Sequence, residues 1–210
     1  MRDPRAQYAN PPRLPEGDEV LLAEFLPGNE PLELEIGPGR GMFILERAVA
    51  APDARLLGME IKRKWSTIVD ERLRAKGFGG RARVVCEDAK DALPRLQPEA
   101  SVARVFVHFP DPWWKKRHAK RMVLGDKLAE QIVRLLCDGG ELYVQTDVMD
   151  RAERYESVLV HPLLEAAGDE PGSPLLAANP YGARSNREKR ADEDGLPVCR
   201  MRYRRRARTP

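Results

Sequence analysis

Candidate strands and candidate helices alternate along this chain from residue 31 onward, and this order constrains the fold more than any other feature. The candidate strands are residues 32–36, 55–61, 83–86, 102–109 and 141–146. The helical patterns are residues 42–50, 64–76, 89–96, 127–137 and 149–160. Parallel strands need long crossover connections, which helices supply. We therefore predict an α/β fold with a doubly wound, mainly parallel sheet covered by helices on both faces.

The two ends of the chain depart from this alternation. Residues 1–17 are rich in proline, arginine and glycine, which disfavours a packed element and predicts a mobile arm. A short helical pattern follows at 20–26, so we divide the chain into an arm with a short helix over 1–30 and one domain over 31–210. From residue 199 to 204 apolar and basic residues alternate with period two, which predicts an antiparallel C-terminal edge strand. Its arginines either protect a solvated edge from aggregation or contact a polyanion such as RNA.

Bulk properties exclude several classes of protein. The 210 residues carry a net charge of +3, and arginines are concentrated near the C-terminus, which is compatible with a polyanionic partner. The cysteines at 86, 137 and 199 are isolated from one another, so neither a disulfide framework nor a zinc site is indicated. No apolar run approaches the roughly 20 residues of a membrane span, and the N-terminus lacks a signal-peptide core. We expect a cytoplasmic protein that uses no membrane and no metal.

A glycine-rich turn directly follows the first candidate strand, where Glu35 precedes Gly37, Gly39 and Gly41. Glycine permits a tight turn and a close approach of a ligand, and this edge of a doubly wound sheet normally binds nucleotides. Such a turn also occurs in ordinary strand-to-helix connections. The dinucleotide fingerprint would need glycine where Met42 stands, so NAD fits poorly. The acid suits the positively charged sulfonium and amino groups of S-adenosylmethionine better than a pyrophosphate.

Two further acids follow the second and third candidate strands. Glu60 stands where a carboxylate can accept both hydroxyls of a ribose. At Asp88 and Ala89 a side chain or a backbone amide can contact an adenine edge. Each acid, and Asp88 above all, has an alternative role as a helix cap. Because three acids fall on successive strand ends, we interpret them together as a nucleotide-cofactor site.

The fourth candidate strand runs into residues 110–121, which read Pro-Asp-Pro-Trp-Trp-Lys-Lys-Arg-His-Ala-Lys-Arg. Two prolines fix the backbone around Asp111, and two tryptophans offer flat apolar surface next to a dense group of cations. A carboxylate, aromatic rings and cations together suit a purine held beside a phosphate backbone. A solvated loop with a core tryptophan is the alternative.

Residues 110–121 closely resemble the hallmark of the bacterial tRNA (guanine-N(7)-)-methyltransferases, Pro-Asp-Pro-Trp-x-Lys-x-Arg-His-x-Lys-Arg, at every fixed position. The resemblance extends from about residue 31 to residue 206. It implies a Rossmann-like class I methyltransferase fold, S-adenosylmethionine as cofactor and tRNA as partner. By this similarity the cofactor or active centre involves Glu35, Glu60, Asp88 and Asp111, and the substrate contacts Lys115 and Asp147. We expect phosphate contacts from Lys115, Arg117, Lys120 and Arg121, and a phosphate or backbone contact from His118.

The family also carries a Thr-x-Phe-Glu motif before its last strand, where this chain has Ser185, Asn186, Arg187 and Glu188. Serine keeps the hydroxyl and the glutamate is retained, but arginine replaces the aromatic residue and puts a stacking role in doubt. The same four residues also read as a capping box, and the two roles can coexist. We include all four as candidate substrate residues. Met122 stands where the family often has another arginine, which removes one phosphate contact.

The chemistry implied by the resemblance needs positioning more than a base. Nitrogen 7 of guanine has a free lone pair and can attack a methyl sulfonium without first losing a proton. A carboxylate can stabilise the positive charge that develops on the purine. We assign this role to Asp111, with Asp147 as the second candidate and Glu188 as the third. His108 and His161 are interpreted as structural.

Two other functions remain open on the sequence alone. Amino-group methyltransferases carry an Asn/Asp-Pro-Pro-aromatic motif at the same strand end, whereas here Asp111 is followed by one proline and then Trp113. A non-catalytic RNA-binding module with a vestigial nucleotide fold has no need of the matched acids that this chain retains. The resemblance further implies a guanine in the variable loop of tRNA, and we expect a monomer or a weak homodimer.

Overall fold

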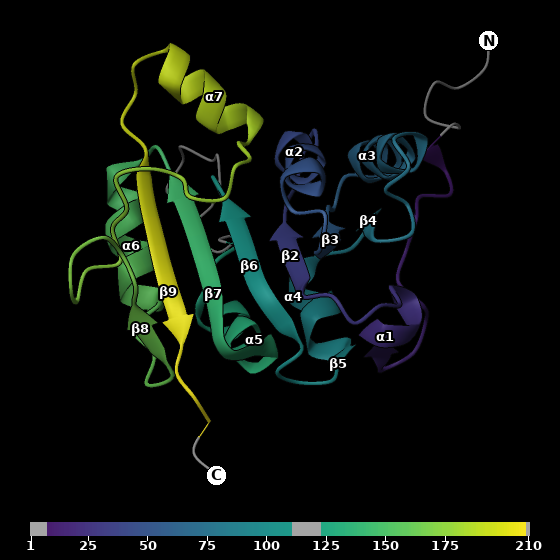
Figure 1. Cartoon of the computed structure of the whole chain (residues 1–210), viewed down its shortest axis with the longest axis horizontal. Coiled ribbons are helices and arrows are strands. Elements are labelled where there is room, and N and C mark those ends of the chain that lie inside the picture. The colour runs from purple at the N-terminus through teal and green to yellow at the C-terminus, as the bar shows by residue number, and fades with distance from the viewer. Residues whose placement is uncertain (1–7, 111–122, 209–210) are drawn as a thin grey trace.

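A seven-stranded sheet runs through the part of the chain that the structure describes, residues 8–110 and 123–208 of a computed structural model (Figure 1). The strands are β2 (Leu32–Ile36), β3 (Arg55–Met59), β4 (Ala82–Val85), β6 (Val102–His108), β7 (Leu136–Thr146), β8 (Leu164–Ala166) and β9 (Cys199–Arg205). They lie in the order β4-β3-β2-β6-β7-β9-β8. The strands from β4 to β7 are parallel, and β9 is antiparallel to both of its neighbours. The predicted fold class is therefore confirmed.

The strand order changes direction at β2. This strand pairs with β3 on one side and with β6 on the other, so the chain first builds the sheet outward to β4 and then returns to the far side of β2. In open α/β sheets the carboxyl ends of the strands at such a switch point are where ligands bind. In Figure 1 this edge faces upward, toward α7 (Asn186–Glu193).

Helices cover both faces of the sheet, as the alternation predicts. They are α2 (Met42–Ala50), α3 (Arg63–Ala75), α4 (Ala89–Ala92), α5 (Asp126–Leu135) and α6 (Met149–Val158), with a 3₁₀ turn at Leu93–Arg95. On one face, α2 and α3 pack Ile44 and Val69 against Leu56. On the other face, residues of α4, α5 and α6 share a core with Leu57. Neighbouring residues of β3 thus enter opposite cores, as the period-two geometry of a strand requires.

The N-terminal arm is more ordered than the sequence predicts. The backbone N–H of Cys86 donates to the carbonyl of Pro12 at 2.7 Å, and Arg13 donates to the carbonyl of Cys86 at 2.9 Å. Leu14 is buried in the main core. The prediction of a mobile arm is therefore wrong for these residues, because one buried apolar side chain and two hydrogen bonds to the residue after β4 anchor them.

The predicted helix at 20–26 is also shorter than expected. Residues 20 and 21 form β1 (Val20–Leu21), which pairs with β5 (Leu96–Gln97), and α1 (Leu22–Phe25) follows. The single helix predicted at 89–96 is likewise interrupted. These residues form α4, the 3₁₀ turn and the first residue of β5, which pairs with β1. A local apolar pattern cannot reveal a pairing between such distant segments.

The C-terminal strand is antiparallel but is not an edge strand. β9 lies between β7 and β8, and β8 forms the edge. Two of the arginines of β9 have carboxylate partners: Arg200 pairs with Glu188 at 3.2 Å, and Arg204 pairs with Glu141 at 3.6 Å. These ion pairs favour a structural role over RNA contact. No helix within the described ranges has the length and apolarity needed to cross a bilayer.

Candidate cofactor and substrate site

The glycine-rich turn connects β2 to α2 at the switch point. Gly37, Gly39 and Gly41 have φ angles of +74°, +55° and +77°, a region that favours glycine. A Cβ atom at Gly37 or Gly39 would meet no atom within 4 Å, whereas one at Gly41 would lie 2.3 Å from Cγ1 of Val69. The first two glycines therefore leave the backbone open to a ligand. Gly41 instead lets α2 approach α3.

Glu60 ties the glycine-rich turn to the end of β3. One carboxylate oxygen accepts the N–H of Gly39 and the other accepts the N–H of Lys62, both at 2.9 Å. The side chain is buried. Each carboxylate oxygen has a second lone pair, so the group remains able to accept a ribose hydroxyl.

Glu35, the second-last residue of β2, is a buried carboxylate with only one oxygen hydrogen-bonded among the described residues. Its Oε1 lies 3.1 Å from Nδ1 of His108, at the end of β6. Its Oε2 has no hydrogen-bond partner among the described residues. Burying an unpaired carboxylate oxygen is costly, so this atom suits a ligand that carries a positive charge. The sulfonium and amino groups of S-adenosylmethionine fit this requirement.

His108 was interpreted as structural from the sequence, and its contact with Glu35 was not predicted. Its ring lies 4.1 Å from that of Phe43, and its Nε2 has no partner in the described part of the chain. Phe106, Tyr143 and Tyr181 continue this aromatic layer. Burial raises the pKa of both tyrosines above the usual range, so their hydroxyls stay neutral. The layer holds His108, and His108 orients Glu35.

Asp88 and Ala89 follow β4 as predicted. Asp88 caps α4, because its carboxylate accepts the N–H of Lys90 at 2.9 Å. The side chain of Asp88 is exposed, and Ala89 is buried. The capping interpretation thus has direct support. One carboxylate oxygen makes that bond, and contact with an adenine remains a prediction.

The segment that carries the family hallmark begins at Pro110, two residues after β6. Asp111, Lys115, Arg117, His118, Lys120 and Arg121 lie outside the described residues. The last residues before them are placed: Phe109 has a φ of +47°, and its N–H donates to the carbonyl of Gln145 at 2.8 Å. A positive φ in a residue with a Cβ is a strained conformation, and such strain is concentrated at functional sites.

Two of the predicted substrate segments meet beyond the end of β7. Arg187 of α7 forms an ion pair with Asp147, and the Asp147 side chain is 10% exposed against 38% for Arg187. The arginine that replaces the family's aromatic residue therefore reaches the carboxylate that the family resemblance assigns to the substrate. Asn186, which begins α7, is exposed beside this pair.

Ser185 and Glu188 have structural partners. The hydroxyl of Ser185 accepts the N–H of Glu188 at 3.1 Å, as a helix cap does. Glu188 is fully buried and does not reach back to complete the capping box. Its oxygens accept hydrogen bonds from Asn179 at 3.0 Å and Arg200 at 3.2 Å. These contacts favour capping and support of the fold over catalysis for both residues.

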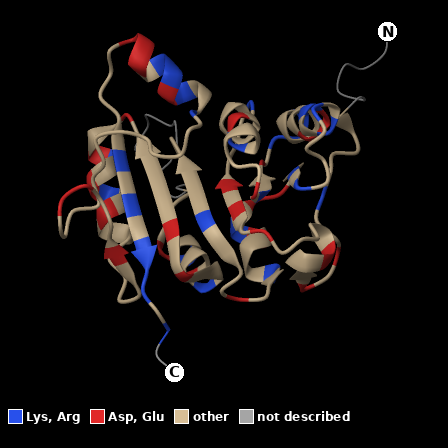
Figure 2. Cartoon of the chain, in the orientation of Figure 1, with Lys and Arg blue, Asp and Glu red and all other residues tan. Residues whose placement is uncertain are grey.

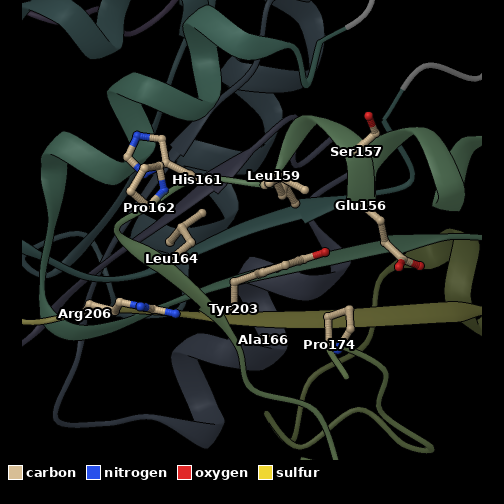
Figure 3. Close-up of a pocket in the computed structure, with 11 residues that line it drawn as sticks. Glu156, Ser157, Leu159, His161, Pro162, Leu164, Ala166, Pro174, Tyr203 and Arg206 are labelled. Atoms are coloured by element: carbon tan, nitrogen blue, oxygen red, sulfur yellow. The ribbon is translucent and has the colours of Figure 1, made fainter. Parts of the chain in front are cut away.

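A hollow of about 620 Å³ lies elsewhere, between α6 and strands β8 and β9 (Figure 3). Leu159, His161, Leu164 and Tyr203 are among its lining residues, and none of the predicted site residues is. Leu164 of β8 pairs with Arg205 of β9, and the preceding residue, Arg204, pairs with Glu141 of β7. Because β9 is antiparallel to β7, Leu164 and the hollow beside it lie toward the amino end of β7, away from the glycine-rich turn. His161 accepts the N–H of Leu163 at 3.1 Å, which supports its structural interpretation.

Known proteins resemble this chain over most of its length. Residues 29–201 match a family described as "Putative methyltransferase". A tRNA (guanine-N(7)-)-methyltransferase of Rhodopirellula baltica is 33% identical over 99% of this chain and 82% of the relative. A protein of the same name from Anaeromyxobacter dehalogenans is 38% identical, over 81% of this chain and 84% of the relative.

Solved structures share the fold at low sequence identity. The 16S rRNA methyltransferase KamB aligns with a TM-score of 0.61 and 15% identity, over 88% of this chain and 92% of KamB. A SAM-dependent O-methyltransferase from Thermotoga maritima aligns with a TM-score of 0.53 and 16% identity, over 90% of this chain and 64% of that protein. The fold is therefore that of Rossmann-like methyltransferases.

Proposed function

The chain belongs to the tRNA (guanine-N(7)-)-methyltransferase family, and we propose that it transfers a methyl group from S-adenosylmethionine to nitrogen 7 of a guanine in tRNA. The identity of 33% and 38% to relatives of that name supports the substrate and the reaction. The structure adds one observation that supports the donor, the buried Oε2 of Glu35 without a partner in the described residues. We place the reacting guanine in the variable loop, as the family resemblance implies.

S-adenosylmethionine supplies the electrophilic methyl group when it is bound. We assign its contacts to Glu35, Gly37, Gly39, Gly41, Glu60, Asp88, Ala89 and Asp111. In this assignment Glu35 faces the positive charge of the donor and Glu60 accepts the ribose hydroxyls. Gly37 and Gly39 admit the donor to the backbone, whereas Gly41 contributes through the packing of α2 on α3.

Asp111 is proposed to act on the guanine. Methylation makes the purine cationic, and a nearby carboxylate favours that charge, either through hydrogen bonds to the Watson–Crick edge or through electrostatics alone. Asp147 is the second candidate, and its pairing with Arg187 keeps a carboxylate near the same edge of the sheet. Glu188 becomes the weakest candidate because Asn179 and Arg200 already occupy its oxygens.

We propose that the substrate residues bind the tRNA around that guanine, with the cations at 115, 117, 120 and 121 contacting its phosphates. The substrate residues are Lys115, Arg117, His118, Lys120, Arg121, Asp147, Ser185, Asn186, Arg187 and Glu188. Ser185 and Glu188 contribute by fixing the start of α7, which presents Arg187. We further propose that the protein acts in the cytoplasm without a metal, as a monomer or a weak homodimer. Light scattering and activity in the presence of a chelator test the last two points.

Incubation with an unmodified tRNA transcript and methyl-labelled S-adenosylmethionine tests the proposed reaction. The expected product carries the label on nitrogen 7 of one variable-loop guanine, which makes the strand labile to cleavage at that base. A label on an exocyclic amino group would identify an amino-group methyltransferase instead. Binding of tRNA without binding of the donor would identify a non-catalytic RNA-binding module.

A separate variant tests the role of Asp111. Replacing Asp111 with alanine should lower turnover at saturating donor by about 100-fold, by analogy with the loss of one charge-stabilising group. Near-normal turnover would remove Asp111 from this role and leave the reaction itself in place.

A further inference from the structure

We infer that Arg40, Lys62, Arg63 and Lys64 form a second phosphate-binding surface for tRNA, in addition to the predicted contacts at residues 115–121. We call these four residues the α3 basic patch. Arg40 lies in the turn after β2, and the other three begin α3. The inference rests on the proposed function, because it takes the polyanion to be the tRNA substrate.

The cations of the patch are exposed and have no carboxylate partner among the described residues. All four residues are exposed, and no ion pair joins any of them to an acid in the described part of the chain. The arginines of β9 differ, since Arg200 pairs with Glu188 and Arg204 pairs with Glu141. Arg200 and Arg204 therefore have protein counter-ions, whereas the four cations of the patch have none among the described residues. A cation without a protein counter-ion is the kind that gains most from a phosphate.

Trp65 gathers two cations of the patch on one aromatic ring. The guanidinium carbon of Arg40 lies 5.4 Å from the ring centroid, and Nζ of Lys64 lies 5.3 Å from it. Cations within about 6 Å of an indole ring are attracted by its quadrupole. The ring thus restrains one cation from the turn after β2 and one from α3, which lowers the entropy lost when they bind a phosphate.

Helix stability does not explain these charges. The first turn of α3 contains no acidic residue, and its N-cap, Lys62, makes no side-chain capping bond. Cations at the positive end of a helix dipole are unfavourable by about 0.3–1 kcal/mol each. Three consecutive cations at this position therefore weaken the helix unless they have another role, and a bound anion supplies one.

The patch is built onto the proposed cofactor turn. The N–H of Lys62 and the N–H of Gly39, the residue before Arg40, both donate to Glu60. Figure 2 shows Lys and Arg on α3, which lies on the same side of the molecule as α2 and α7. A tRNA that places its guanine at the switch point can thus lay its backbone over α3. In this proposal the tRNA backbone crosses the start of α3 at the carboxyl edge of the sheet.

The double variant Arg63→Ala with Lys64→Ala tests the inference. Both side chains are exposed, and neither residue donates to Glu60. The matched control is Arg72→Ala with Lys76→Ala, which removes two exposed cations near the other end of α3. The affinity for unmodified tRNA is measured at several salt concentrations between about 50 and 200 mM, because phosphate contacts weaken as salt is added. The affinity for S-adenosylhomocysteine is measured alongside it.

The patch variant should bind tRNA about tenfold more weakly at low salt. The slope of log affinity against log salt concentration should be smaller in magnitude by about 1–2, because each phosphate contact contributes about 0.9 to this slope. The control variant should match the wild-type protein, and all three proteins should bind S-adenosylhomocysteine with affinities within about twofold.

Unchanged tRNA affinity and salt slope in the patch variant would overturn the inference. The proposed function would still stand if the wild-type protein methylates tRNA. An equal loss in the control variant would also overturn it, because the effect would then follow total charge. Lys64→Glu reverses one exposed charge, and an unchanged slope there contradicts the inference even if the double variant fails to fold. A wild-type protein that neither binds nor methylates tRNA would refute the proposed function itself.

Discussion

Replacing Gly41 with alanine should destabilise the fold, whereas the same change at Gly39 should chiefly weaken binding of S-adenosylmethionine. The added methyl group at Gly41 would lie 2.3 Å from Cγ1 and 2.6 Å from Cγ2 of Val69, a buried residue of α3. At Gly39 it would meet no atom within 4 Å. Two neighbouring glycines of one turn thus separate packing from ligand access.

The magnitudes follow from the two local geometries. An alanine with a left-handed φ loses about 1–2 kcal/mol of unfolding free energy. This loss applies at both positions, because φ is +77° at Gly41 and +55° at Gly39. Only Gly41 adds an overpacking cost of about 1–3 kcal/mol. Gly41→Ala should therefore lose about 2–5 kcal/mol of unfolding free energy. Gly39→Ala should lose about 1–2 kcal/mol.

Urea unfolding and calorimetric titration with S-adenosylhomocysteine measure the two effects separately. In a domain of this size each kcal/mol lowers Tm by about 2–4 °C, so the difference between the variants is measurable by thermal unfolding as well. Folded Gly39→Ala should bind the nucleotide at least about tenfold more weakly, because a methyl group then occupies the backbone face of the turn. Equal destabilisation of the two variants, or normal binding by Gly39→Ala, would refute this account of the turn.

Two further variants test the layers beneath the site. Glu33 is buried and accepts two hydrogen bonds from Arg47 at 2.7 and 2.8 Å and one from Arg104 at 2.8 Å. Glu33→Ala should therefore cost about 3–5 kcal/mol of unfolding free energy, because it leaves Arg47 buried without its carboxylate. A loss below about 1 kcal/mol in urea unfolding would contradict this. His108→Ala should raise the KM for S-adenosylmethionine about tenfold at little change in kcat, because it removes the partner of Glu35, and His108→Gln should restore part of the loss. A fall in kcat without a change in KM would show that His108 does not act through the donor.

The sequence predicted best where a local signal marked the boundary. The first strand and helix were predicted at residues 32–36 and 42–50, which are the bounds of β2 and α2. The glycine-rich turn separates them and cannot continue either element. The start of β7 was placed at residue 141, whereas this strand begins at Leu136. Gly139 and Gly140 interrupt its apolar pattern, and pairing with β6 overrides that local signal.

The site divides in the same way between local and distant contacts. Glu35, Glu60 and Asp88 were predicted as strand-end acids. Glu35 is the second-last residue of β2, Glu60 directly follows β3, and Asp88 lies three residues after the end of β4. The partner of Glu35 was not predicted, because His108 is brought to it by the parallel register of β2 and β6 rather than by any sequence motif. The burial of Glu188 between Asn179 and Arg200 likewise depends on the tertiary fold.

Amide hydrogen exchange with and without S-adenosylhomocysteine tests most directly whether the donor binds at the switch point. Binding should slow exchange at residues 37–41 and 60–62, where the turn and Glu60 are tied together. Residues 156–166, which line much of the hollow beside α6, should exchange as before. Protection at 156–166 with none at the glycine-rich turn would contradict the proposed site.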